Sequence, residues 1–427
     1  MPNRYLLSEM ADYAESRVNI KSVSLDDYVS TDNLLPNKHG LALAVNLPSQ
    51  QGKIPSYQKA DILIGNIRPY LKKIWFADRV GGCSADVLVI RTKEHHNPKF
   101  VFYGLFRDDF FNHMMRGSKG TKMPRGDKPQ IMRFALPKFD KGTQHEIASV
   151  LSALDAKIGI NNRINTELEA IANTLYDYWF IQFDFPNENG KPYKSSGGKM
   201  EYNPILKREI PNGWSEDSLE ALGDIVGGST PSTADSKNFM SNGIPWITPN
   251  DLSDNVGKKF ISRGNIDISE QGMKSASLKL YPKNTVLMSS RAPIGYMAIA
   301  RNPVTTNQGF KSFIPNKGYS AEFIFYTVKS VMKTIVKYSG GSTFKEVSAS
   351  ALKTVKIVLP PSNILKSYTE IIVNIFNQQD ILEQENQKLV ELRDWLLPML
   401  MNDQVRIASG INTTTAENEK TARWRNG

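Results

Sequence analysis

Two stretches of the chain carry apolar residues at alternating steps of three and four, the period of a helical seam. The first predicted seam contains Ile147, Leu151, Leu154, Ile158, Asn161, Asn165, Leu168, Ala172, Leu175 and Trp179. The second contains Ile371, Ile375, Gln378, Leu382, Glu385, Leu389, Leu392, Leu396 and Met399. A stripe with this period keeps facing one partner helix, whereas an ordinary amphipathic helix packs only on its own domain. We therefore predict two long helices that pair with each other, with packing on the parent domains as the alternative.

Polar residues interrupt both seams near their centres. Antiparallel pairing about residues 163 and 385 would bring Asn161 and Asn165 close to Glu385. Buried polar residues can fix the register of two helices at some cost in stability, and we expect that role here. The first seam predicts a rod of roughly 50 Å at about 1.5 Å per residue. Pro398 is expected to end or bend the second helix.

The regions before both helices show the pattern of short strands, with β-branched residues between turn formers. The runs are ADILIGNI (60–67), SADVLVIRT (84–92), GIPWITPNDL (243–252) and NTVLMSSR (284–291). Each globular part is therefore predicted to be mixed α/β. Residues 184–212 are rich in Gly, Pro, Ser and Asn, which favours an irregular connection. The polar residues 403–427 are expected to form a disordered tail.

The chain also repeats itself. Arg68 aligns with Arg291 at an offset of 223, Phe102-Tyr103 with Phe325-Tyr326, and Leu136-Pro137 with Leu359-Pro360. Landmarks in one order at one spacing indicate a duplicated unit. The predicted fold class is α/β (α+β): two tandem mixed domains separated by two long helices that pair as an antiparallel coiled coil. The expected parts are domain 1 (1–140), helix 1 (141–183), connection (184–212), domain 2 (213–361), helix 2 (362–402) and tail (403–427).

Composition narrows the class of partner. Among 427 residues, 53 Lys and Arg against 43 Asp and Glu give a net charge of +10, which favours a polyanion, with double-stranded DNA as the leading candidate. The single cysteine, Cys83, excludes an intrachain disulfide and is expected to be a core residue in a reducing compartment. The chain shows neither an apolar run that could span a bilayer nor a signal peptide in MPNRYLLSEMADY. We expect a cytoplasmic protein without membrane contact.

Motifs of catalysis are not found in the sequence. GDIVGGST (223–230) lacks the lysine of a phosphate loop. Asn302-Pro303 continues as Val304-Thr305, whereas a methyltransferase acting on an exocyclic amine of a base would be expected to show an Asn-Pro-Pro-aromatic motif. No G-x-S-x-G elbow occurs. The five histidines, which have no ligand partners at metal-binding spacing, are His39, His95, His96, His113 and His145. We therefore predict no catalytic, cofactor or metal site in this chain.

Basic and polar loops are the candidates for DNA contact. The segment RGSKGTKMPRGDK (116–128) places a cation at every third position, which suits a loop lying along phosphates, and YSGGSTFKEVS (338–348) is its less charged counterpart. Thr and Asn side chains in TPST (230–233) and WITPNDLS (246–253) could reach base edges. A solvated surface loop and turn capping remain the alternatives. The candidate residues are Arg68, Lys72, Arg116, Lys119, Lys122, Arg125, Lys128, Thr230, Thr248, Asn250, Arg291 and Lys345.

The order of these parts resembles the specificity subunit of type I restriction-modification systems, from Leu6 to Asn402. The segments that carry the resemblance are QHEIASVLSALDAKIGINNRINTELEAIANTLYDYWF, FPNENGKPYKSSGGKM leading to IPNGW, and GGSTPST followed by GIPWITPNDL. The resemblance implies two target recognition domains, each reading one half of a split DNA site, with the paired helices as a spacer. Because half-site separation is set by protein geometry, the target should be bipartite. It should also be asymmetric, because the loops KGTKMPRGDK and GGSTFKEV of the two halves differ in charge and side chains.

The resemblance also implies partners. Two methyltransferase (M) subunits that use S-adenosylmethionine would bind the helical region, and restriction (R) subunits that use ATP and Mg would complete the complex. This chain would be a non-catalytic subunit that holds no cofactor. Two alternatives remain open: a self-sufficient DNA-modification enzyme, and a coiled-coil adaptor that does not bind DNA.

Overall fold

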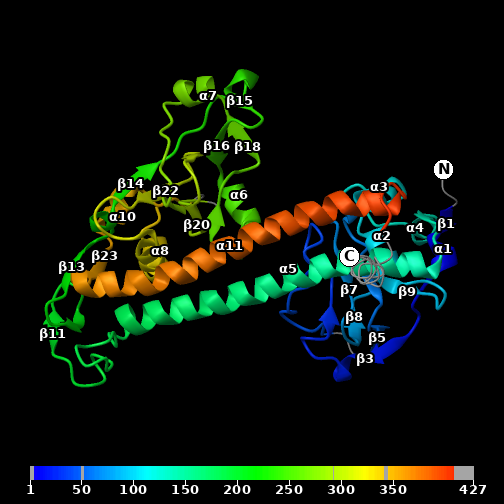
Figure 1. The fold of residues 1–427 in the computed structure, drawn as a ribbon, viewed down its shortest axis with the longest axis horizontal. Coiled ribbons are helices and arrows are strands. Elements are labelled where there is room, and N and C mark those ends of the chain that lie inside the picture. The colour runs from blue at the N-terminus through cyan, green and yellow to red at the C-terminus, as the bar shows by residue number, and fades with distance from the viewer. Residues whose placement is uncertain (1–3, 50–51, 292, 341–344, 408–427) are drawn as a thin grey trace, which may run out of the picture. The chain divides into compact units, whose positions relative to one another are not determined.

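The computed structural model describes residues 4–49, 52–291, 293–340 and 345–407 (Figure 1). The chain divides into two compact units: unit 1 contains the residues up to Gly159 and those from Lys388 onward, and unit 2 contains Ile160–Gln387. Both long helices therefore contribute one stretch to each unit. The domain boundaries expected from the sequence lie near the ends of the long helices, whereas the two compact units divide within these helices. The expected boundaries stay a prediction.

Unit 1 is built from short strands and helices followed by the start of the first long helix. Its antiparallel sheet has the order β2-β9-β6-β7, and a second sheet has the order β3-β5-β8-β4. The strands are β1 (Arg4–Leu6), β2 (Ala11–Tyr13), β3 (Arg17–Asn19), β4 (Tyr28–Val29), β5 (Lys53–Tyr57), β6 (Ile62–Gly65), β7 (Ile74–Phe76), β8 (Gly81–Cys83), β9 (Val87–Thr92) and β10 (Ala135–Pro137). The short helices are α1 (Leu7–Met10), α2 (Pro98–Leu105), α3 (Asp108–Arg116) and α4 (Lys128–Met132).

Unit 2 contains the corresponding elements and a further hairpin. Its main sheets have the orders β14-β22-β19-β20-β17 and β15-β18-β16-β21. The strands are β11 (Met200–Asn203), β12 (Arg208–Pro211), β13 (Ser215–Ser218), β14 (Asp224–Gly227), β15 (Phe239–Met240), β16 (Ile244–Ile247), β17 (Phe260–Ile261), β18 (Ile266–Ile268), β19 (Val286–Met288), β20 (Met297–Ala300), β21 (Thr305–Thr306), β22 (Lys311–Ile314) and β23 (Lys356–Leu359). The short helices are α6 (Pro249–Asp254), α7 (Glu270–Ser275), α8 (Ala321–Ser330), α9 (Met332–Lys337) and α10 (Ala349–Thr354).

The two copies share one topology, which confirms the predicted duplication and the mixed α/β class. In each copy the first strand pairs with the last, β1 with β10 and β13 with β23. The strand order β2-β9-β6-β7 recurs as β14-β22-β19-β20. Each smaller sheet contains one parallel pair, Val29 beside Cys83 and Ile247 beside Thr306. Cys83 is fully buried, as the sequence predicted.

The long helices are α5 (Lys141–Tyr176), which continues as a π-helical turn (Asp177–Ile181), and α11 (Ser362–Met401). They run antiparallel in both units (Figure 1). In unit 1 a guanidinium nitrogen of Arg393 lies 2.9 Å from a carboxylate oxygen of Asp155. In unit 2 Asn161 donates to the Glu385 carboxylate at 2.7 Å and to the side-chain oxygen of Asn386 at 2.9 Å.

These contacts test the predicted polar layer and the expected role of Pro398. The pairing of Asn161 with Glu385 is confirmed. Asn165 lies further along, where its backbone carbonyl accepts a hydrogen bond from Gln379 at 3.4 Å. The α11 helix continues through Pro398 to Met401, so this proline does not end it.

The first predicted seam follows the buried stripe of α5, but the second matches the buried stripe of α11 only in part. None of the ten predicted positions on α5 is exposed. On α11, the predicted Leu382 is buried, but Ile371 and Leu392 are 45% and 43% exposed and Gln378 is exposed as well, so the assignment of these three to the seam was wrong. Besides Leu382, the buried stripe contains residues that were not predicted: Ile372, Phe376, Gln379, Glu383, Leu397 and Leu400. Two of these are polar, and a count of apolar residues does not register them.

The predicted irregular connection is also corrected. Residues 184–212 contain the hairpin of β11 and β12. Phe185 and Trp214 are buried and stack on each other with ring centroids 5.1 Å apart. Aromatic burial therefore orders a segment whose composition favours an irregular connection. Residues 408–427, most of the expected tail, lie outside the described residues. Among the described residues, the structure contains no helix with the length and apolar character needed to cross a membrane.

A cluster of aromatic rings forms the centre of unit 2 and generates a stability prediction. Tyr176 and Tyr368 are both buried there, with ring centroids 6.4 Å apart. The hydroxyl of Tyr176 donates to Thr327 at 3.2 Å, whereas the hydroxyl of Tyr368 has no hydrogen-bond partner among the described residues.

We expect Tyr368→Phe to raise the free energy of unfolding by about 1 kcal/mol, because it removes an unsatisfied buried hydroxyl. The matched variant Tyr176→Phe breaks a hydrogen bond and should lower it by about 1 kcal/mol. Urea unfolding of both variants measures the two effects. Equal destabilisation by both substitutions would contradict this description of the core.

Candidate nucleic-acid interface

The basic segment of unit 1 forms a hairpin that lies against the turn carrying Arg68. Lys119 and Arg125 exchange two backbone hydrogen bonds, each of 3.0 Å. The backbone N–H of Arg68 donates to the Pro124 carbonyl at 2.8 Å, and that of Gly126 donates to the Asn66 carbonyl at 3.2 Å. The structure thus brings Arg68 and the cations of residues 116–128 onto one continuous surface, which we call the basic hairpin surface.

Most cations of the basic hairpin surface project into solvent. Arg68, Arg116, Lys119, Lys122, Arg125 and Lys128 are exposed. Lys119 faces Asp127 at 3.3 Å and Arg125 faces Asp86 at 3.0 Å, but their side chains remain 85% and 60% exposed. Ion pairs this exposed contribute little stability, so both cations can exchange their partner for a phosphate at small cost.

Lys72 differs from Lys119 and Arg125 because its side chain is only 30% exposed and it shares its ion-pair partner with a second lysine. Its ammonium and that of Lys38 both lie 2.9 Å from the carboxylate of Asp108. Burial acts to raise the pKa of Asp108, but hydrogen bonds from the two lysines outweigh it and lower the pKa. Lys72 therefore supports α3, and contact with DNA would require this pair to break.

Unit 2 contains the equivalent hairpin with the opposite charge at one position. Gly340 and Glu346 exchange backbone hydrogen bonds of 3.1 and 3.0 Å. The backbone of Glu346 also forms an isolated β-bridge with Arg291, as the backbone of Arg125 does with Ile67. The Glu346 carboxylate lies 3.9 Å from Arg291 and 3.4 Å from Lys311. Lys345 is exposed, and residues 341–344 lie outside the described residues. The two copies thus present different chemistry from one backbone arrangement.

The polar candidates of unit 2 gather around residues 307–309. A Cβ atom at Gly309 would lie 2.9 Å from Pro249 and 3.5 Å from Arg291. A Cβ atom at Gly228 would lie 2.0 Å from the Thr306 carbonyl, so only glycine allows the segment leading to Thr230 to approach.

Each polar candidate has a distinct setting. The exposed Thr230 donates to Gln308, a neighbour that the sequence patterns did not single out. Asn250 is exposed in the first turn of α6. Thr248 is the N-cap of α6: its hydroxyl donates to the Asp251 carboxylate at 2.6 Å and accepts from the Asp251 backbone at 3.4 Å. The structure assigns Thr248 to helix capping, which was the alternative for this residue.

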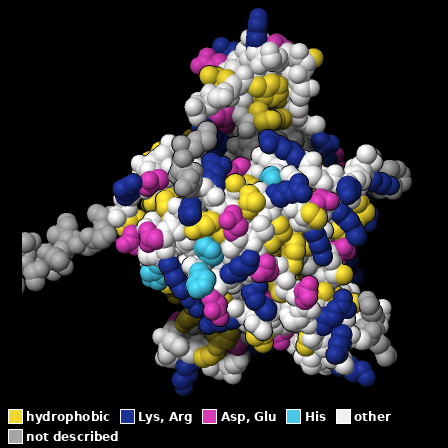
Figure 2. Space-filling view, turned by 90° about the vertical axis from the view of Figure 1, so that its right-hand side faces the viewer, with side chains coloured by type: hydrophobic (Ala, Val, Ile, Leu, Met, Phe, Trp, Pro, Cys, Tyr) yellow, Lys and Arg dark blue, Asp and Glu magenta, His cyan; other side chains and the backbone are white. Residues whose placement is uncertain are grey.

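Surface charge alone does not delimit this interface. Figure 2 shows Lys and Arg side chains spread over one face of the molecule, with Asp and Glu side chains between them. Gln308 beside Thr230 and Lys311 beside Glu346 were not singled out from the sequence, because they occur within or beside strand-like runs without a motif of their own. Among the described residues, no cluster of three or more His, Cys, Asp or Glu side chains is arranged to hold a metal ion.

Comparisons with known proteins give the family context. Residues 37–170 and 211–391 match the family described as type I restriction modification DNA specificity domain. The chain is 26% identical to the type I restriction enzyme HindI specificity subunit of Haemophilus influenzae, over 94% of this chain and 99% of that protein. It is 42% identical to the type I restriction enzyme MjaIX specificity subunit of Methanocaldococcus jannaschii, over 44% of this chain and 45% of that protein.

A solved structure supports the same fold. The crystal structure of a type I restriction-modification system S subunit from M. genitalium matches with a TM-score of 0.55 at 14% identity. The match covers 93% of this chain and 96% of that one.

The basic hairpin surface generates a binding prediction. Replacing Lys119, Lys122 and Arg125 together with Gln should weaken binding to double-stranded DNA. If all three contact phosphates, the slope of log affinity against log salt concentration should fall by about 0.9 per residue. Lys72→Gln is the control, and its change in slope should be smaller than that of one hairpin cation, because the less exposed Lys72 shares Asp108 with Lys38. An unchanged salt slope in the triple variant would exclude this hairpin from the interface.

Proposed function

Because the chain belongs to the family of type I restriction-modification DNA specificity subunits, we propose that it reads a bipartite, asymmetric DNA site, one half with each recognition domain. The observation that carries this proposal is the duplication. Each copy has the same strand order and an equivalent hairpin, with Arg125 in one copy where the other has Glu346. Equivalent surfaces with different side chains suit two half-sites of different base sequence.

The helix pair is proposed to set the distance between the half-sites. A rod of roughly 50 Å corresponds to an upper limit of about 14 base pairs at about 3.4 Å each. The buried contact of Asn161 with Glu385 supports a fixed register, since it can form at only one alignment of the helices.

Two methyltransferase subunits are proposed to dock on the helical region. An exposed apolar stripe on α5 supports this: Ile160, Ile164 and Ile171 are 43%, 41% and 53% exposed. Ile160 and Ile164 are one turn apart and Ile171 lies two turns further along the same face, and exposed apolar residues gathered on one face are typical of an interaction site.

The catalytic chemistry is proposed to reside in the partners. S-adenosylmethionine would bind the methyltransferase subunits, and ATP with Mg would bind the restriction subunits. The role of the present chain would be to bind DNA and hold the methyltransferases over their target bases, without a cofactor of its own.

Mapping of methylated bases tests the proposal. The chain, coexpressed with its methyltransferase partner, should direct methylation to one sequence made of two short base clusters with a fixed gap. The methyltransferase alone is the control, and the purified chain alone should transfer no methyl group from S-adenosylmethionine.

Three results would contradict the proposal. Methylation scattered without sequence preference would reject a role in specificity. Methyl transfer by the chain alone would favour a self-sufficient enzyme. If the assembled complex does not bind DNA, a structural adaptor would be favoured.

A further inference from the structure

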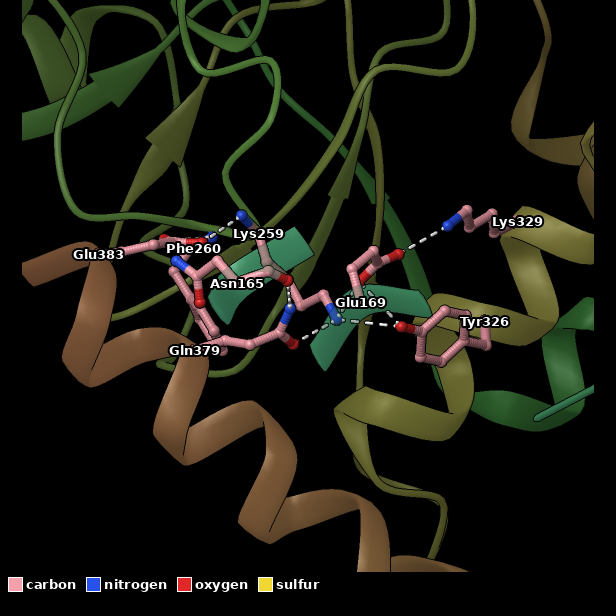
Figure 3. A network of polar contacts seen from close by, with 8 residues as sticks. All are labelled: Asn165, Glu169, Lys259, Phe260, Tyr326, Lys329, Gln379 and Glu383. Carbon is pink, nitrogen blue, oxygen red and sulfur yellow. Dashed lines mark hydrogen bonds and ion pairs between the residues drawn. The ribbon is translucent and has the colours of Figure 1, made fainter. Parts of the chain in front are cut away.

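A buried lysine of the second recognition domain contacts both long helices (Figure 3). Lys259 immediately precedes β17, and its side chain is only 4% exposed. Its ammonium lies 2.6 Å from the carboxylate of Glu169 on α5 and donates to the side-chain oxygen of Gln379 on α11 at 2.7 Å. It also donates to the Tyr326 hydroxyl at 3.0 Å and lies 3.7 Å from the centre of the Phe376 ring.

The backbone beside this lysine is bound to α11 as well. The Glu383 carboxylate accepts the backbone N–H groups of Lys259 at 2.6 Å and Phe260 at 3.2 Å. The same carboxylate forms an ion pair of 2.6 Å with Arg301, which also pairs with Asp380. Residues 259–260 are therefore held at consecutive turns of α11.

The charges of this cluster balance each other. Burial lowers the pKa of Lys259 to about 8, although the charge of Glu169 opposes the shift. Burial acts to raise the pKa of Glu169, but attraction and hydrogen bonding by Lys259 and Lys329 hold it at about 2. Lys259 thus stays charged at neutral pH because it has its partners, and moving it away from them would leave a charge buried and unpaired.

This cost distinguishes the cluster from the apolar contacts around it. Apolar side chains recur every three or four residues along α11, so packing against Tyr368, Ile372 and Phe376 alone could shift by one helical turn. Steps of one turn between packed elements are a known form of rearrangement. The hydrogen bonds to Gln379 and Glu383 can form at only one position.

The first copy is anchored more simply. Tyr103 occupies the position equivalent to Tyr326, and its hydroxyl donates to the Asp155 carboxylate on α5 at 2.6 Å. Arg393 on α11 pairs with the same carboxylate at 2.9 Å and lies 4.8 Å from the centre of the Phe106 ring. Tyr326 likewise donates to the Glu169 carboxylate on α5 at 3.0 Å, so both copies use a tyrosine bound to a carboxylate of α5, and the second adds the buried lysine.

We propose that Lys259 is a positioning residue: it fixes the second recognition domain at one place along the helix pair and so fixes the number of base pairs between the half-sites. This inference rests on the proposed function. It predicts that loss of the lysine relaxes spacing while leaving the bases read by each domain unchanged.

The test uses the complete complex with its methyltransferase partner. The substrates are DNA duplexes that carry both half-sites, with the intervening gap of native length, one base pair longer, or one base pair shorter. The Lys259→Met variant removes the charge and keeps an unbranched apolar side chain of similar length. Lys329→Gln is the matched control, because Lys329 pairs with the same Glu169 carboxylate at 2.8 Å from a side chain that is 43% exposed.

The wild-type complex and Lys329→Gln should methylate only the native gap. In Lys259→Met, methylation of the altered gaps relative to the native gap should rise by about tenfold, comparable to the discrimination that one base pair provides. Base substitutions within either half-site should remain as harmful as in the wild type.

Other outcomes would contradict either the role of Lys259 or the proposed function. A folded, assembled Lys259→Met complex with the wild-type gap profile would overturn the inference. If Lys259→Met does not assemble, Tyr326→Phe and Gln379→Met each remove one contact of the lysine, and wild-type profiles in both would overturn it equally. Indifference of the wild-type complex to gap length would instead contradict the proposed function.

Discussion

The buried face along α5 and α11 is shared by two kinds of contact, helix to helix and helix to domain. In unit 1, Asp155 of α5 binds both Arg393 of α11 and Tyr103 of the domain. In unit 2, Glu169 of α5 and Gln379 of α11 both bind Lys259. Pairing of the helices and placement of each domain are therefore coupled, because the same side chains take part in both.

The duplication supplies this arrangement within one chain. Each copy contributes one long helix, and a helix that would need a second molecule as a partner finds it in the other copy. The two copies have nevertheless diverged where they meet the helices and at their hairpins. One anchor is a tyrosine, a carboxylate and an arginine, and the other is a buried lysine with four neighbours. A site read by two such copies need not be symmetric.

Sequence patterns predicted the fold well and the contacts unevenly. Period and repeats identified both helices, four strands and the duplication, since these depend on backbone regularity and apolar spacing. The seam of α11 was misplaced in part, because Gln379 and Glu383 are buried by specific partners that lie far away in the sequence. Thr248 could not be separated from a base-reading residue until its bond to Asp251 was visible. Lys259 carried no local signal, since its role arises only from tertiary contacts with α5, α8 and α11.

The central claim is that the helix pair determines the separation of two independently read half-sites. Inserting seven residues into each helix, after Gly159 and after Gln387, lengthens both helices of the pair by one heptad and keeps the seam in phase. The insertion adds about 10 Å, or about three base pairs. Mapping of methylated sites for the altered complex should give the same two base clusters with a gap about three base pairs longer. An unchanged gap, with both clusters still recognised, would contradict the account.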